Sequence, residues 1–167
     1  MGWPEPRDRR NGFFQQPGEC AMIMSRSDQT RFPKFTKYVR YSLPQVVDVK
    51  AIVAGFAKYG QIDRATLKRA LTWGNEPHIV IKPLSGAIGL FNASVDPNVI
   101  NIHTRIVQEF EDGHGLRKTK WNKDVFLVGV TLLHELVHWA DNLDGIDFPD
   151  EEGEQFETDV YGMVINE

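Results

Sequence analysis

The feature that most constrains this chain is a stretch in which apolar residues appear on every side of a helical wheel. It runs from Val125 to Leu143 and contains TLLHELVHWAD. A helix that is apolar all round is a buried helix, so we expect it at the centre of the domain. Three ionisable side chains, His134, Glu135 and His138, lie inside it. Because a buried charge without a partner is costly, these three groups need a compensating partner.

The spacing of the three residues indicates what that partner is. His134 and His138 are separated by about 6 Å along the helix axis, so both imidazoles project from one face. Two imidazoles on one face can bind one metal ion, and Glu135 lies beside them, about 100° around the axis. This is the H-E-x-x-H arrangement, with two zinc ligands and a carboxylate that takes a proton from water. The alternative is a pair of core histidines hydrogen-bonded to their neighbours.

A catalytic zinc site needs a third protein ligand, and no histidine follows His138. Residues 141–167 contain ten acids and no lysine or arginine, so we expect a carboxylate. Glu157, central on the next predicted helix, is the predicted third ligand, and Glu154, near the start of that helix, is its main competitor. Asp144 is a further candidate, although the chain lacks the glycine that usually lets such a residue turn back to the metal.

Other polar residues near these positions are candidates for supporting roles. Asp141 is predicted either to accept a hydrogen bond from a ligand imidazole or a backbone group, or to be a solvated acid at the helix end. In peptide hydrolysis the tetrahedral oxyanion needs a hydrogen-bond donor besides the metal. Tyr161, one turn after Glu157, is the predicted catalytic donor, with His114 and His103 as alternatives. Packing for the tyrosine and solvent exposure for the histidines are the competing interpretations.

Apolar periodicity and turn residues predict the remaining elements. The predicted helices cover residues 43–60, 62–74 (with Asp63 as N-cap), 104–113, 122–145 (beginning at Asn122 or Asp124) and 154–167 (with Phe156, Val160 and Met163 on its buried face). The predicted strands cover residues 79–82 and 98–103, residues 86–94 form a strand or loop, and residues 114–121 form a polar loop.

Composition limits the class of protein. A chain of 167 residues suits one domain, and its net charge of −4 does not indicate nucleic-acid binding. One cysteine, Cys20, excludes an intrachain disulfide framework and a cysteine zinc cluster. No signal peptide is visible, and the longest apolar run, residues 125–130, is too short to cross a bilayer. Residues 1–30, rich in Arg, Gln, Gly, Pro and Ser, are predicted to be a flexible arm, a linker or a cloning remnant, and residues 31–167 to be the domain.

HELVH followed by GEQFETDVYG resembles the glutamate-ligand zincins. More narrowly, residues 125–162 resemble the zincin-like metallopeptidase toxin domains at the C-termini of bacterial polymorphic toxins and type VI secretion effectors. The resemblance implies an α+β fold in which a small mixed sheet packs on the buried H-E-x-x-H helix, and the following helix supplies the third ligand. It also implies an edge strand that aligns substrate, for which NVINIH (residues 98–103) is the candidate, and a chain that ends where its parent polypeptide ends.

The predicted function is therefore that of a zinc-dependent endopeptidase with one Zn²⁺ per chain, which hydrolyses peptide bonds of a protein or peptide substrate with metal-activated water. The resemblance further implies a delivered or secreted bacterial effector with a cognate immunity protein, and no nucleic-acid partner or membrane span is expected. One alternative is a zinc-binding zincin-fold domain with a binding or regulatory role. Glu135 argues against it, because a structural zinc site does not need that carboxylate. The other is a helical interaction protein with a chance HELVH.

Overall fold

The computed structural model describes residues 23–146 and 151–166. The helices are α1 (Arg26–Arg31), α2 (Pro33–Lys37), the π-helical turn η1 (Tyr38–Ser42), the 3-10 turn η2 (Leu43–Asp48), α3 (Lys50–Tyr59), α4 (Arg64–Leu71), α5 (Thr104–Glu111), α6 (Leu127–Asp141) and α7 (Glu152–Tyr161). The strands are β1 (His78–Lys82), β2 (Gly89–Asn92), β3 (Asp96–His103), β4 (Leu116–Lys118) and β5 (Asp124–Phe126). The fold is α+β, as the sequence predicts.

A three-stranded mixed sheet lies beside α6, with strand order β1-β3-β2. The central strand β3 runs parallel to β1 and antiparallel to β2. Its buried Ile100 and Ile102 face the core together with Ile79 of β1, as expected for β-branched residues on a half-buried pleated surface. The prediction that residues 98–103 form the edge strand is therefore wrong, because β3 is hydrogen-bonded on both sides. The edge strand that contacts α6 is β2.

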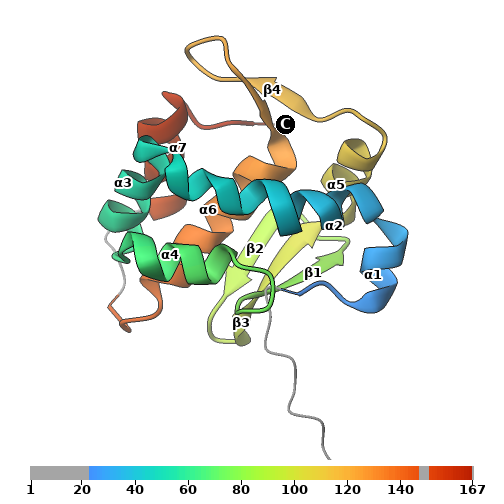
Figure 1. The fold of residues 1–167 in the computed structure, drawn as a ribbon, viewed down its shortest axis with the longest axis horizontal. Helices are drawn as coiled ribbons and strands as arrows, with labels where there is room; N and C mark the ends of the chain where they lie inside the picture. Colours follow the sequence, from blue (N-terminus) through green and yellow to red (C-terminus); the bar gives the residue numbers. More distant parts are fainter. Residues whose placement is uncertain (1–22, 147–150, 167) are drawn as a thin grey trace, which may run out of the picture.

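The central element of the fold is α6, which Figure 1 shows in orange with α3, α7 and the sheet around it. Of its 15 residues, 13 are buried, and the two that are not are His134 and His138. In a helix that is otherwise buried, two partly exposed residues near its middle indicate that this face borders an open space. The prediction of a buried helix is confirmed, and its two histidines lie where a ligand can reach them.

The segment before α6 differs from the sequence prediction. Residues 116–118 and 124–126 form an antiparallel hairpin, whereas a polar loop and the first turn of the long helix were predicted there. Phe126 packs edge-on to Phe110, with ring centroids 4.8 Å apart. Because this contact comes from a residue distant in sequence, helical periodicity alone places the start of α6 too early.

The closing helix α7 docks through one aromatic side chain. Phe156 is fully buried against Phe56 of α3, with ring centroids 5.1 Å apart. The helix ends at Gly162, which adopts φ 77°, a left-handed conformation that favours glycine. The predicted helix over residues 154–167 is therefore too long, and Met163 is 43% exposed rather than buried. The tail after Gly162 turns back toward the β4–β5 hairpin (Figure 1).

The N-terminal half follows the predictions more closely. Asp63 caps α4, and its side chain accepts a hydrogen bond from the Thr66 amide at 2.7 Å. The predicted helix over residues 43–60 is divided, because Val49 is extended between η2 and α3. Packed structure also begins before residue 31, since Met24 is buried and α1 follows it. The part of the predicted arm over residues 1–22 lies outside the described residues.

Among the helices that the structure describes, none has the length and apolar character needed to cross a membrane.

The close approach of α3 and α7 gives a test of the packing. A Cβ atom on Gly55 would lie 2.6 Å from the Phe156 ring. Gly55→Leu is therefore expected to lower the free energy of unfolding by about 2 kcal/mol through overpacking, although leucine is the better helix former. Urea denaturation followed by circular dichroism measures this.

The matched control is Ala57→Leu, at an exposed position on the same helix. It is expected to change the free energy of unfolding by no more than about 0.5 kcal/mol. Equal stability of the Gly55 and Ala57 variants would contradict the packing described here.

Candidate metal centre and catalytic base

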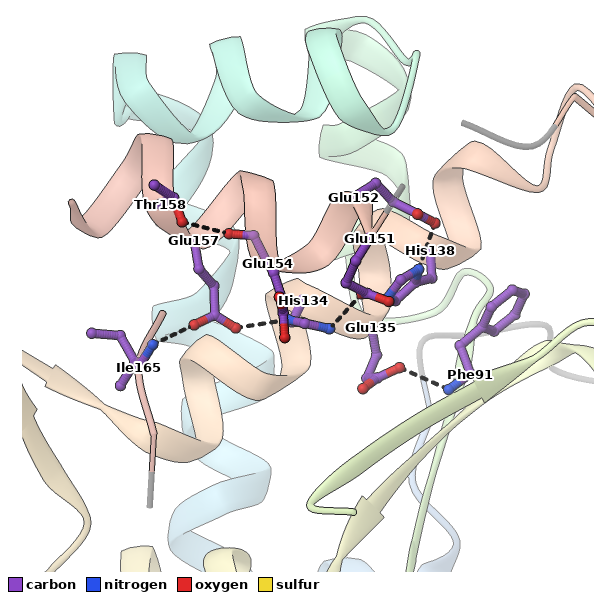
Figure 2. A network of polar contacts seen from close by, with 10 residues as sticks. All are labelled: Phe91, His134, Glu135, His138, Glu151, Glu152, Glu154, Glu157, Thr158 and Ile165. Carbon is purple, nitrogen blue, oxygen red and sulfur yellow. Dashed lines mark hydrogen bonds and ion pairs between the residues drawn. The ribbon is translucent and has the colours of Figure 1, made fainter. Parts of the chain in front are cut away.

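Two imidazoles from α6 lie next to each other beneath the first turn of α7. Their ring centroids are 5.0 Å apart, and Figure 2 shows both rings directed toward Glu151. The Glu151 Oε1 atom lies 2.9 Å from His138 Nε2 and 3.4 Å from His134 Nε2. One ligand atom from each of the three residues falls within 4.8 Å of the other two. Three donor atoms therefore converge on one point.

The opposite nitrogen of each imidazole is held by a buried carboxylate. His134 Nδ1 donates to Glu157 Oε1 at 2.7 Å, and His138 Nδ1 donates to Glu152 Oε1 at 2.5 Å. Glu157 and Glu152 are only 4% and 6% exposed. A carboxylate accepts hydrogen bonds, so each pair places the ring proton on Nδ1 and leaves the Nε2 lone pair directed toward Glu151.

The chemistry of these donors fits a zinc-type metal ion. Two imidazole nitrogens and one carboxylate oxygen form one of the usual three-ligand sets of catalytic zinc. The hydrogen bonds from Nδ1 to carboxylates orient the rings and raise their basicity, as in known metal sites. Several carboxylates surround the two rings, so a bound divalent cation also offsets their mutual repulsion.

Glu135, a residue of α6, lies beside this centre and contacts the edge strand β2 of the sheet. Its Oε2 atom accepts a hydrogen bond from the Phe91 amide of β2 at 2.7 Å. Its Oε1 atom is adjacent to Gly89, where any Cβ atom would lie 2.5 Å from it. One carboxylate oxygen is thus fixed, and the other faces the cavity in the space that glycine leaves open.

The surroundings of Glu135 and His134 shift the pKa of both side chains. Burial raises the pKa of the Glu135 carboxyl, and the neighbouring imidazoles offset this only in part. Burial by itself lowers the pKa of His134, but the hydrogen bond to Glu157 and the nearby carboxylates outweigh it and raise that pKa. A carboxylate with raised pKa is a stronger proton acceptor, as a general base requires.

The candidates for the third ligand occupy different places. Glu157, the predicted ligand, binds the Nδ1 side of His134, and its Oε2 atom accepts from the Ile165 amide at 2.6 Å. Glu154 points toward the same cavity but is not in the converging group. Asp144 accepts a hydrogen bond from a backbone amide in the turn after α6. Among the described residues, Glu151 holds the position that the sequence interpretation assigned to Glu157.

Sequence reasoning missed Glu151 and Glu152 because it began the closing helix two residues too late. Glu152 is the first residue of α7, and Glu151 is the residue immediately before it. The acidic sequence DEEGE was the available signal, since a carboxylate at the first turn of a covering helix lies nearest to the helix below it. The closing helix was predicted to begin at residue 154, so the two acids before it were not considered as ligands.

The other predicted residues lie outside the converging group. Tyr161 is buried, with its ring edge-on to Phe156. His103 caps α5 by accepting from a backbone amide at 3.0 Å, and His114 is exposed in the loop before β4. None of these three lines the cavity beside His134. Asp141 is buried and accepts a hydrogen bond from the Gln61 side chain at 2.9 Å.

A cavity of about 390 Å³ opens on the His134 side of the centre. Its walls come from the segment leading into β2, from α6 and α7, and from the tail after Gly162. It is lined by Gly86, Ala87, Ile88, Gly89, Thr131, His134, Glu135, Glu154, Glu157, Val164, Ile165 and Asn166. Glu135, the predicted base, and the His134 imidazole thus both border this cavity.

Comparison with known sequences gives one match. The sequence profile of the family described as metallopeptidase toxin 3 matches residues 28–162. No curated protein and no solved structure matches the chain significantly. The matched region extends from α1 to the glycine that ends α7, so it includes both histidines and all of the carboxylates around them.

The close contact of α7 with His134 gives a test of the site. A Cβ atom on Gly153 would collide with the His134 ring at Nε2. Gly153→Ala is therefore expected to displace that ring and lower the affinity for Zn²⁺ by about ten-fold or more. Competition with a chromogenic chelator measures the affinity, and Gln155→Ala on the same helix is the control. Unchanged affinity in the Gly153 variant would exclude His134 Nε2 as a ligand atom.

Proposed function

The chain belongs to the metallopeptidase toxin 3 family, and from that premise we propose that it is a zinc-dependent endopeptidase. It hydrolyses internal peptide bonds of protein substrates and acts as the toxic domain of a delivered bacterial effector. The observation that carries the proposal is the convergence of two imidazole Nε2 atoms and the Glu151 carboxylate next to Glu135. That arrangement combines a metal-binding set with a base, which a purely structural metal site does not need.

We assign the zinc ligands to His134 Nε2, His138 Nε2 and Glu151. Zn²⁺ bound there would polarise a peptide carbonyl and lower the pKa of a water molecule. Glu152 and Glu157 act as positioning residues, because each holds one imidazole through Nδ1. This assignment revises the sequence interpretation, in which Glu157 was itself the ligand.

Glu135 is the proposed general base. The Phe91 amide fixes its Oε2 atom, so Oε1 is the oxygen that accepts a proton from the attacking water. The same oxygen then delivers the proton to the leaving nitrogen as the peptide bond breaks. Because Glu135 is buried, few water molecules compete for its proton. The edge strand β2 lies directly beside this oxygen, so a substrate backbone aligned along β2 would present its carbonyl there.

The biological setting is proposed from the family. Metallopeptidase toxins act on the proteins of another cell, so the domain needs a delivery machine, for which type VI secretion is our candidate. A producing cell then needs a cognate immunity protein to block the site. The Glu151 side chain is 51% exposed, which supports access to the proposed metal centre by such a protein and by substrate.

Metal binding is the first test of this proposal. The purified chain is expected to bind about one Zn²⁺, and His134→Ala, His138→Ala and Glu151→Ala are expected to lose it. Glu157→Gln keeps the ion but binds it about 10- to 100-fold more weakly, as substitution of a supporting carboxylate typically does. Elemental analysis after dialysis, together with chelator competition, measures both effects.

Asp144→Asn is the control for the metal experiment, because its carboxylate bonds only to a local backbone amide among the described residues. Its zinc content and affinity are expected to match those of the wild type. Wild-type affinity in Glu151→Ala together with complete loss in Glu157→Ala would overturn the ligand assignment and restore Glu157 to that role.

Activity is the second test. Glu135→Gln is expected to bind zinc normally and to cleave unfolded protein at least about 10²-fold more slowly, since the base is removed and the ligands are kept. Expression of the wild type in a bacterial host is expected to slow growth, whereas the Glu135 variant is tolerated. Equal growth with both forms, in cytoplasm and in periplasm, would contradict the toxic role. Equal cleavage rates would contradict the assignment of the base.

A further inference from the structure

The cavity on the His134 side adjoins the atoms that would carry out hydrolysis, because Glu135 and His134 both line it. A peptide held with its carbonyl at Glu135 must place a neighbouring side chain there. We propose that this cavity binds a basic side chain, arginine or lysine, of a substrate residue that flanks the scissile bond. The inference rests on the proposed peptidase function and adds the class of substrate that the site selects.

Of the three carboxylates that line the cavity, Glu154 is the one available to bind a cation. Glu157 is occupied by His134 and the tail amide. Glu135 is held at Oε2 by the Phe91 amide, and its Oε1 atom is the one that the proposed mechanism assigns to the attacking water. The Glu154 carboxylate has no hydrogen-bond or ion-pair partner among residues 23–146 and 151–166, and Figure 2 shows it directed toward His134. No lysine or arginine belongs to the described lining of the cavity. A cationic group that enters it therefore meets a carboxylate with free acceptor capacity.

The walls of the cavity suit the stem of a long basic side chain. Ile88, from the segment before β2, and Val164 and Ile165, from the tail after α7, are part of its lining. Arginine and lysine bury their methylene groups against such surfaces while their charged ends reach a polar group. The tail after Gly162, which forms one wall of the cavity, is held in place by two hydrogen bonds. The Ile165 amide donates to Glu157, and the Asn166 carbonyl accepts from Arg117. The cavity therefore offers apolar contacts to the stem and a carboxylate to the charged end, and both favour a long basic side chain.

The cavity on the His138 side differs in its chemistry. It is lined by apolar groups such as Phe91, Ala93 and Ile146. Its two buried acids are engaged, since Glu152 binds His138 and Asp141 binds Gln61. The preference for a basic residue is therefore expected at one flanking position only, and not on both sides of the cleaved bond.

The test uses the zinc-loaded full chain and a synthetic mixture of randomised peptides, acetylated at the N-terminus and amidated at the C-terminus. Blocking the termini removes the free α-amino group, the other cation that this carboxylate could bind. Mass spectrometry of the products is expected to show arginine and lysine enriched at one fixed position next to the cut. For single peptides of matched sequence, kcat/KM is expected to be about ten-fold higher with arginine than with norleucine at that position.

Two substitutions of Glu154 test the residue itself. Glu154→Gln is expected to bring the arginine-to-norleucine ratio close to one while zinc content stays unchanged. Glu154→Arg is expected to reverse the preference toward acidic residues. The control is Asp159→Asn, which makes the same change of charge on α7 at a residue that pairs with Lys58 and does not line this cavity. Its ratio is expected to equal that of the wild type.

Each contrary result has its own meaning. Cleavage with no basic preference, with an apolar preference, or with a ratio that Glu154→Gln leaves unchanged overturns this inference and leaves the proposed function standing. Cleavage only of peptides with a free N-terminus also overturns it, because the bound cation is then the α-amino group. Absence of any cleavage that depends on zinc and Glu135 overturns the proposed function and this inference together.

Discussion

The structure depends on the pairing of two buried carboxylates of α7 with two imidazoles of α6. Glu152 and Glu157 are almost completely buried, and a buried carboxylate without a partner destabilises a fold by several kcal/mol or takes up a proton. Their hydrogen bonds to His138 and His134 remove that penalty. Since the pairs exist only when α7 lies across α6, the same contacts dock the helix and orient the two imidazoles that we propose as metal ligands.

The candidate site is assembled from elements that are far apart in sequence. The amide of Phe91 connects the sheet edge to the proposed base Glu135, and the Glu157 carboxylate connects His134 to the tail at Ile165. Glycines permit the closest contacts, since Gly89 and Gly153 leave room for a carboxylate oxygen and an imidazole that any side chain would displace. A change in the position of α7 therefore affects the proposed metal ligands and the cavity wall at the same time.

The predictions of the fold were accurate where local signals determine the structure. The cap at Asp63 and the buried helix α6 follow from side-chain chemistry and periodicity within one segment. The errors concern contacts between segments. The position of β3 between β1 and β2 depends on pairing with β1 residues about twenty positions earlier in the sequence. The hairpin before α6 and the exposure of Met163 likewise depend on how separate segments pack together. Periodicity records which face of an element is apolar, but it does not record what covers that face.

For the candidate site, the sequence by itself determined that His134 and His138 share one helix face beside Glu135, because a helix places residues four apart on one face whatever surrounds it. The acidic composition after residue 141 also determined that the candidates for a third ligand are carboxylates. Only the tertiary structure decided where each of those carboxylates lies relative to the two imidazoles. It brings Glu151 to the two Nε2 atoms and places Glu157 behind His134. The reason is that the rotation and depth of α7 are fixed by Phe156 packing on Gly55 and Phe56, a contact between segments about 100 residues apart.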